Sequence, residues 1–131
     1  MHTGMHDPNI KETYNLVASD MVVGTSVYDP NDQKIGQVER LILEKTSGKV
    51  SYAVLSFGGF LGIGEDYYPV PWEMLTYDES VGGFRVNITR EQVENENAPR
   101  YRAADDYEWT SENGRRVSDY YGVPPYGAGA M

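Results

Sequence analysis

Short β-rich runs, separated by turn sequences every 8 to 12 residues, are the feature that most constrains how this chain can fold. They fill residues 22–88, and the first turn, at residues 29–32, reads Asp-Pro-Asn-Asp. The last two runs form a predicted hairpin over residues 75–88, in which apolar residues alternate after the turn. This succession predicts a mainly β fold, a small antiparallel barrel or sandwich.

The inner runs differ in their pattern of apolar residues. The run Ile35 to Glu44 does not alternate strictly, so we expect a bulge or strong curvature. The run Val50 to Phe57 is apolar on both faces, which is typical of a central strand covered on both sides. The two prolines in residues 66–72 predict an extended segment at an edge or at a strand end.

The pattern changes after the last strand. Thr89 and Gln92 have the spacing of a capping box, so a short helix is expected over residues 89–96. The last third, residues 100–131, contains six aromatic residues, whereas disordered tails are usually poor in aromatics. We therefore expect this extension to pack on its own barrel or on a partner subunit. The residues expected to make these contacts are Trp109, Tyr120 and Tyr121.

Length and composition restrict the classes of function. A chain of 131 residues fits one domain with short extensions, and its net charge of −9 disfavours nucleic-acid binding. Cysteine is absent, so disulfides and thiolate metal sites are excluded. The longest uncharged run, Val50 to Gly64, is shorter than the roughly 20 apolar residues of a bilayer span. This short uncharged run and the lack of a targeting segment predict a soluble, cytoplasmic protein. We also expect no cofactor and no metal.

The sequence contains no constellation typical of catalysis. The glycine-rich stretch at residues 56–72 lacks the Lys-Ser or Lys-Thr pair of a phosphate loop and continues into Glu65 and Asp66, so we interpret it as a hairpin connection. The only histidines, His2 and His6, lie in the polar leader, away from any folded base position. Three pairs of carboxylates are adjacent in sequence: Glu65/Asp66, Asp78/Glu79 and Asp105/Asp106. On a strand, the two members of a pair would point to opposite faces and could not act together on a substrate. We interpret these pairs as parts of solvated turns. We therefore predict that the protein is not an enzyme.

A contact surface is the most specific functional feature. Phe60 and Leu61 lie at a glycine-rich tip, where their own hairpin cannot easily bury them. The candidate interaction surface is Phe60, Leu61, Ile63, Tyr67 and Trp72. A second hypothesis is a small-ligand pocket lined by Tyr52, Tyr67 or Trp72. A third is RNA or ribosome association through Arg100, Arg102, Arg115 and Arg116.

The stretches "VYD…KIGQVE", "GKVSYAVLS" and "GGFLGIGE…YPVPW" together closely resemble the PRC-barrel domain, which the reaction-centre H subunit and the ribosome-maturation factor RimM share. The resemblance covers about Ser19 to Pro99, and "VENENAP" and "RRVSDYYGVPPYG" resemble stand-alone bacterial members. It implies a barrel of about six strands with a short helical turn near residues 72–75. It implies an adaptor without catalytic activity.

These observations divide the chain into three expected parts: a flexible leader at residues 1–18, a PRC-barrel domain at 19–99 and a C-terminal extension at 100–131. The leading hypothesis is a non-catalytic protein–protein interaction module. We expect it to form a homodimer, because small barrels leave edge strands that can pair between subunits.

Overall fold

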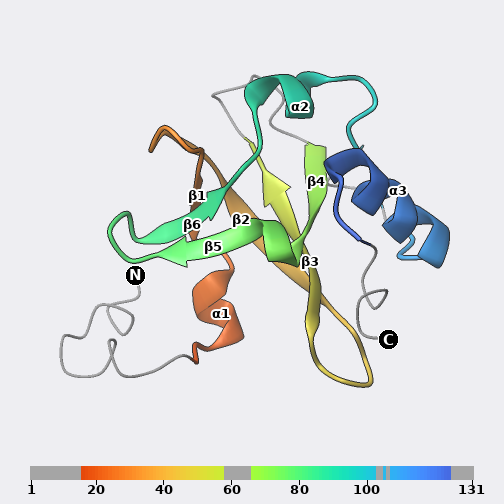
Figure 1. Cartoon of the computed structure of the whole chain (residues 1–131). Coiled ribbons are helices and arrows are strands. Elements are labelled where there is room, and N and C mark those ends of the chain that lie inside the picture. Colours follow the sequence, from red (N-terminus) through yellow and green to blue (C-terminus); the bar gives the residue numbers. More distant parts are fainter. Residues whose placement is uncertain (1–15, 58–65, 103–104, 106, 125–131) are drawn as a thin grey trace.

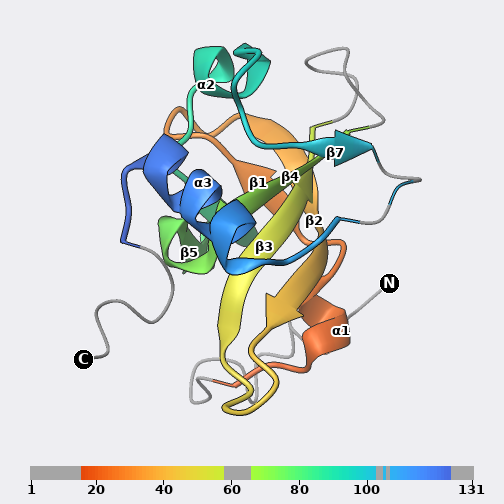
Figure 2. The ribbon, with the colours of Figure 1, turned by 90° about the vertical axis from the view of Figure 1, so that its right-hand side faces the viewer.

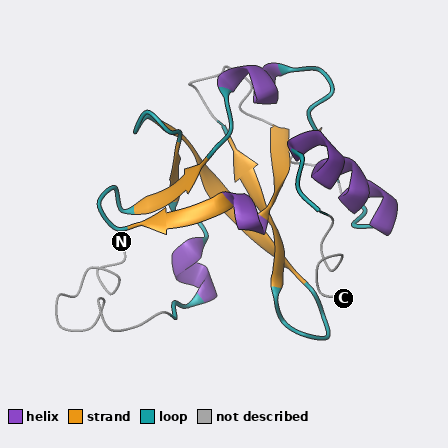
Figure 3. Ribbon diagram, in the orientation of Figure 1, coloured by secondary structure: helices purple, strands orange, loops and turns teal. Residues whose placement is uncertain are grey.

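The structure, a computed structural model, describes residues 16–57, 66–102, 105 and 107–124 (Figure 1). In chain order, its elements are α1 (Ser19–Val22), β1 (Ser26–Tyr28), β2 (Lys34–Leu43), β3 (Val50–Ser56), β4 (Asp66–Pro71), the 3₁₀ helix η3 (Trp72–Met74), β5 (Leu75–Asp78), β6 (Gly83–Val86), α2 (Arg90–Glu94), β7 (Tyr101–Arg102) and α3 (Ser111–Tyr121). Figure 3 separates these helices and strands by colour. The mainly β prediction, with short helices near residues 72–75 and 89–96, is confirmed.

The strands form one seven-stranded sheet in the order β5-β6-β1-β2-β3-β4-β7. It differs from the prediction in three details. Within the described residues it has seven strands, where about six were predicted, the two ends of the strand order are not paired, and β1 pairs with β6 in parallel. After β1 the chain passes through four other strands before it reaches β6. Strand β6 then lies along the side of β1 that β2 leaves free (Figure 1).

The long strand β2 and its neighbour β3 have the predicted character. Register shifts in β2 occur between Val38 and Arg40 and between Ile42 and Leu43, which confirms the expected irregularity. β3 lies between β2 and β4, and three consecutive residues at its centre are buried, which confirms a strand covered on both faces. This pair of strands is the middle of the sheet.

The proline-containing strand β4 lies near one end of the sheet, as predicted. Its pairing with β3 extends to Pro71, whereas β7 pairs only with Asp66 and Tyr67. Pro69 and Pro71 therefore lie where the outer side of β4 has no strand partner, the position that a residue without an N–H tolerates. Helix α3 packs on β4 along this stretch, as the two views in Figures 1 and 2 show.

The hydrophobic core is mostly aliphatic and gathers side chains from nearly every element. The fully buried side chains include Val27, Val38, Leu55, Val70 and Val117. The rings of Phe57 and Tyr68 meet edge to face inside it, with centroids 5.1 Å apart. Because α3 supplies Val117 and Tyr121, the C-terminal extension is part of this core.

Helices α2 and α3 begin at residues whose side chains cap them. The capping box is confirmed: Gln92 N–H donates to the Thr89 hydroxyl, and Thr89 N–H donates to the Gln92 side chain. In α3, Thr110 accepts from Asn113 N–H, and Gly122 ends the helix in the left-handed region at φ 73°. No helix in the described residues is long and apolar enough to cross a membrane.

Helix α3 itself was not predicted. Its buried face is formed by Gly114, Val117, Ser118 and Tyr121, at positions i, i+3, i+4 and i+7. Val117 and Tyr121 are apolar and Gly114 and Ser118 are small, so the helix is amphipathic, and this periodicity was missed in the sequence. Gly114 is required by close approach, because a Cβ there would lie 2.5 Å from the Tyr52 hydroxyl oxygen.

Candidate interaction surface

Five aromatic rings form a continuous ladder on the outside of the sheet, which we call the aromatic ladder. Its members are Tyr67 from β4, Tyr101 from β7, Tyr107 and Trp109 from the segment before α3, and Tyr52 from β3. Successive ring centroids are 5.7, 4.8, 4.6 and 5.6 Å apart. Segments separated by more than 50 residues thus contribute to one surface.

Each ring of the aromatic ladder is partly exposed. Burial of the inner side nevertheless raises the pKa of Tyr52, Tyr101 and Tyr107 above the usual value for tyrosine. The Tyr101 hydroxyl oxygen is itself buried and has no hydrogen-bond partner among the described residues. At the far end, the Arg40 guanidinium lies 5.3 Å from the centroid of the Tyr67 ring, in cation–π contact.

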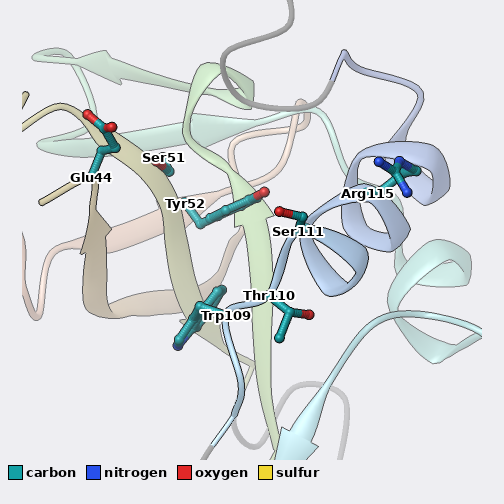
Figure 4. Close-up of a pocket in the computed structure, with 8 residues that line it drawn as sticks. Glu44, Ser51, Tyr52, Trp109, Thr110, Ser111 and Arg115 are labelled. Carbon is teal, nitrogen blue, oxygen red and sulfur yellow. The ribbon is translucent and has the colours of Figure 1, made fainter. Parts of the chain in front are cut away.

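The aromatic ladder ends in a cleft between strands β2 and β3 and the start of α3 (Figure 4). Its volume is about 440 Å³, within the range of pockets that bind ligands. The lining residues are Glu44, Ser51, Tyr52, Trp109, Thr110, Ser111, Gly114 and Arg115. In Figure 4 the Tyr52 side chain reaches across the cleft towards Ser111, while Trp109 lies below it.

Opposite charges stand on the two sides of the cleft, with Glu44 on the strand side and Arg115 on the helix side (Figure 4). The Glu44 carboxylate accepts a hydrogen bond from Ser47 N–H at 2.9 Å. The hydrogen bonds from Ser47 lower the pKa of Glu44, so this carboxylate is ionised throughout the neutral range. None of the ion pairs between described residues includes Glu44 or Arg115.

The structure separates the residues of the predicted interaction surface. Tyr67 belongs to the aromatic ladder, whereas Trp72 packs on Phe84 at a centroid distance of 5.6 Å, in another part of the sheet. The three remaining residues, Phe60, Leu61 and Ile63, lie outside the described residues. Their role in binding stays a prediction.

The three predicted tail residues contact their own chain. Trp109 stacks beside Tyr52, the Tyr120 hydroxyl donates to the Gln92 carbonyl at 2.6 Å, and Tyr121 is buried in the core. Their contact with a partner subunit stays a prediction. Sequence reasoning did not select Tyr101 and Tyr107 as site residues, although aromatics that alternate with acidic residues in this segment are a usable indication.

One arginine of the RNA hypothesis has a structural role instead. Arg100 donates to the Tyr68 hydroxyl at 3.1 Å and to the Asn95 carbonyl at 3.0 Å, and its guanidinium lies 5.7 Å from the centroid of the Tyr68 ring. It therefore ties the segment after α2 to β4. Arg102, Arg115 and Arg116 are exposed.

Metal ligands and shifted carboxyl pKa values were sought among the described residues. They contain no group of three or more potential metal ligands close together. The carboxyl with the largest pKa change is Asp78, whose pKa is lowered to about 2 by hydrogen bonds from Ser80 and Arg85. It lies in the β5–β6 turn, away from the cleft, and its ion pair with Arg85 stabilises that turn.

The chain was compared with known structures, curated proteins and protein families. A crystal structure of a Pseudomonas aeruginosa protein assigned as the 16S ribosomal RNA processing protein RimM is similar, with 14% identity, a TM-score of 0.43, and coverage of 62% of this chain and 49% of that one. This chain thus spans about half the length of that protein. No curated protein matches the sequence. A model of the PRC-barrel domain matches residues 16–93, more than half of the chain, so the protein belongs to the PRC-barrel family.

Proposed function

We propose that this protein is a non-catalytic interaction module that binds a partner protein through the aromatic ladder. One observation carries the proposal: five partly exposed rings from four separate segments lie in unbroken contact on one surface. A domain that needed these rings only for stability would gain more by burying them completely, as it does with Phe57 and Tyr68.

Tyrosine and tryptophan are the residues most suited to such a surface. They are enriched in the buried centres of protein interfaces, and with arginine they account for many of the residues that dominate binding energy. Here the ladder ends on one side at Arg40 and on the other at a cleft that contains Arg115. The composition of the surface therefore matches that of an interface centre.

A homodimer is part of the same proposal, together with residence in the cytoplasm. Its support is the outer strand β5, which has no strand neighbour on its outer side among the described residues and exposes Tyr77. Such an edge can pair with the same edge of a second copy. Light scattering at tens of micromolar tests this, and a mass of one chain at all concentrations would refute the dimer.

The test of the interaction module is affinity capture from the native cells, followed by identification of bound proteins by mass spectrometry. The tagged wild type is compared with Trp109→Ala, which removes a central ring, and with Glu79→Gln, an exposed change in the β5–β6 turn. We expect one protein to be enriched by the wild type and by Glu79→Gln, and lost with Trp109→Ala.

Two further results decide the outcome. Thermal unfolding of each variant shows whether Trp109→Ala still folds. A Phe60→Asp/Leu61→Asp variant tests the loop that the sequence predicts as a contact surface. Capture of no protein, or equal capture by a folded Trp109→Ala, would refute a role for the aromatic ladder. If the captured protein is lost only with the Phe60→Asp/Leu61→Asp variant, the contact surface is that loop and not the aromatic ladder.

A further inference from the structure

We infer that the cleft beside the aromatic ladder binds an extended, proline-containing segment of a partner protein, with a basic side chain placed against Glu44. This inference rests on the proposed function and deepens it, because it names the chemistry of the partner. Four observations carry it: the hydrogen-bonding groups of the cleft, its aromatic floor, the closed edge of β4 and the charge of Glu44.

The side chains that line the cleft offer hydrogen-bond donors and acceptors. The hydroxyls of Ser51 and Ser111 can donate or accept, whereas the Arg115 guanidinium can only donate. The Thr110 hydroxyl accepts from Asn113 N–H, so its own proton is available to donate. Arg115 and Thr110 therefore suit acceptors of an occupant. A proline-containing segment supplies such acceptors, because each proline has a carbonyl, and the polyproline helix makes no internal hydrogen bonds.

The floor of the cleft suits a proline ring. Tyr52 and Trp109 have centroids 5.6 Å apart and planes tilted by 30°, and both rings are partly exposed. Two tilted rings present a shallow apolar surface next to hydrogen-bonding groups. Aromatic-lined grooves of this kind recognise extended proline-rich segments, whose restricted backbone loses little conformational entropy on binding.

The neighbouring sheet edge excludes an alternative mode of peptide binding, the addition of a strand. β4 pairs outwards with β7 only at Asp66 and Tyr67, and then continues through Pro69 and Pro71. These prolines offer no N–H to a new strand, and α3 packs over this stretch. A segment bound here must be held by side chains, which again favours a polyproline conformation over a β-strand.

The negative charge of Glu44 favours a basic residue next to the proline in the bound segment of the partner. Glu44 is ionised at neutral pH and lies at the wall opposite α3. The chain as a whole carries a net charge of −9, so its long-range field also attracts a cationic segment. A lysine or arginine of the partner would complete an ion pair with Glu44, while Arg115 donates to the carbonyls of the segment.

The inference is tested by fluorescence anisotropy on the full chain with three dye-labelled peptides. The first has a lysine followed by three Pro-Pro-Ala repeats, the second has glutamate in place of the lysine, and the third has alanine in place of every proline. We expect the first to bind with saturation. The glutamate peptide should bind about tenfold more weakly or not at all, the loss expected for one charged hydrogen bond. The alanine peptide should also bind more weakly, because it lacks the restricted backbone of the proline segment.

Matched variants place the binding in the cleft. Glu44→Gln keeps the side-chain shape and an acceptor for Ser47 N–H, and should weaken the lysine peptide about tenfold, so that the lysine and glutamate peptides bind about equally. Glu79→Gln removes an exposed carboxylate elsewhere and should change nothing. Glu44→Lys should reverse the preference between the lysine and glutamate peptides, which a purely structural effect of the substitution would not do.

Other results would overturn the inference. Equal binding of the alanine peptide would remove the requirement for proline, and an unchanged preference in Glu44→Lys would remove the role of this carboxylate. If no peptide binds at millimolar concentration, the cleft is not a site for such segments. The proposed function is then still decided separately, because capture that depends on Trp109 would stand without this partner chemistry.

Discussion

The middle of the sheet and the C-terminal extension bury their side chains in different ways. Between β1, β2, β3 and β6, the chain places aliphatic residues such as Val27, Val38 and Leu55, which are completely inaccessible. The extension instead contributes rings such as Tyr101, Tyr107 and Trp109, which contact one another and remain partly exposed. The aliphatic side chains in the middle of the sheet expose no surface to solvent, whereas the rings of the extension still present apolar surface to it.

This difference separates stability from binding. A completely buried aliphatic side chain contributes about 1.5–3 kcal/mol to folding, and it has no surface left for a partner. A half-buried ring contributes less to folding and keeps its outer face for contact. The comparison predicts that substitutions in the middle of the sheet affect mainly the free energy of unfolding. Those in the aromatic ladder should affect mainly binding.

The largest effect is expected at the centre of β3. Leu55→Ala removes a completely buried side chain and should lower the free energy of unfolding by about 2–5 kcal/mol, because it leaves a cavity that the neighbours fill only partly. Urea denaturation measures this change. Tyr107→Ala, made as the comparison, should cost clearly less. An equal cost for both would show that the two regions do not differ as proposed.

The contact between the extension and the sheet is tested by Gly114→Ala. The added Cβ would lie 2.5 Å from the Tyr52 hydroxyl oxygen, so either the Tyr52 side chain or α3 must shift. We expect a net loss of about 1–3 kcal/mol from this overpacking, and faster amide hydrogen exchange in α3 than in β3. Arg116→Ala, on the exposed side of the same helix, is the control. A more stable Gly114→Ala protein would mean that the better helix propensity of alanine outweighs the collision.

A smaller effect is expected from the helix cap of the extension. Thr110→Ala removes the hydroxyl that accepts from Asn113 N–H at 3.1 Å, and should cost about 1 kcal/mol. Thr89→Ala, the matched change in the capping box of α2, should cost a similar amount. Thermal unfolding of both variants provides the comparison. If only Thr89→Ala lowers the midpoint, α3 does not unfold together with the sheet.

The smallest effect concerns acid stability at the end of the sheet away from the ladder. The pKa of Asp78 is lowered from 3.8 to about 2, because Ser80 and Arg85 donate hydrogen bonds to its carboxylate. A lowered pKa stabilises the fold above pH 4, and this contribution is lost as the pH falls towards 2. Asp78→Asn should therefore be less stable at neutral pH, and its unfolding midpoint should approach that of the wild type near pH 2. A constant difference down to pH 2 would contradict this account.

The prediction succeeded where local chemistry decides structure. The turn at residues 29–32 forms because the Asp29 carboxylate accepts from Asn31 and Gln33 N–H, both close in sequence. The cap at Thr89 and the buried strand β3 likewise follow from a few neighbouring residues. The parallel pairing of β1 with β6 joins residues more than 50 positions apart, and no local pattern specifies it.

A small β fold, several of its turns, the cap at Thr89 and the central strand could be predicted from the sequence alone, because these depend on periodicity and on short-range hydrogen bonds. The PRC-barrel family was recognised from the resemblance of whole sequence stretches, and the family model confirms it. The packing of α3 on β4 emerged only from the tertiary structure, because it joins elements far apart in the sequence, and Val117 and Tyr121 share the buried face of the helix with the small residues Gly114 and Ser118. The tertiary structure also brought Glu44 and Arg115 to opposite sides of one cleft and joined five rings into the aromatic ladder. These arrangements depend on chain segments that meet only after the sheet has formed, and long-range contacts of this kind leave no periodic pattern in a single sequence.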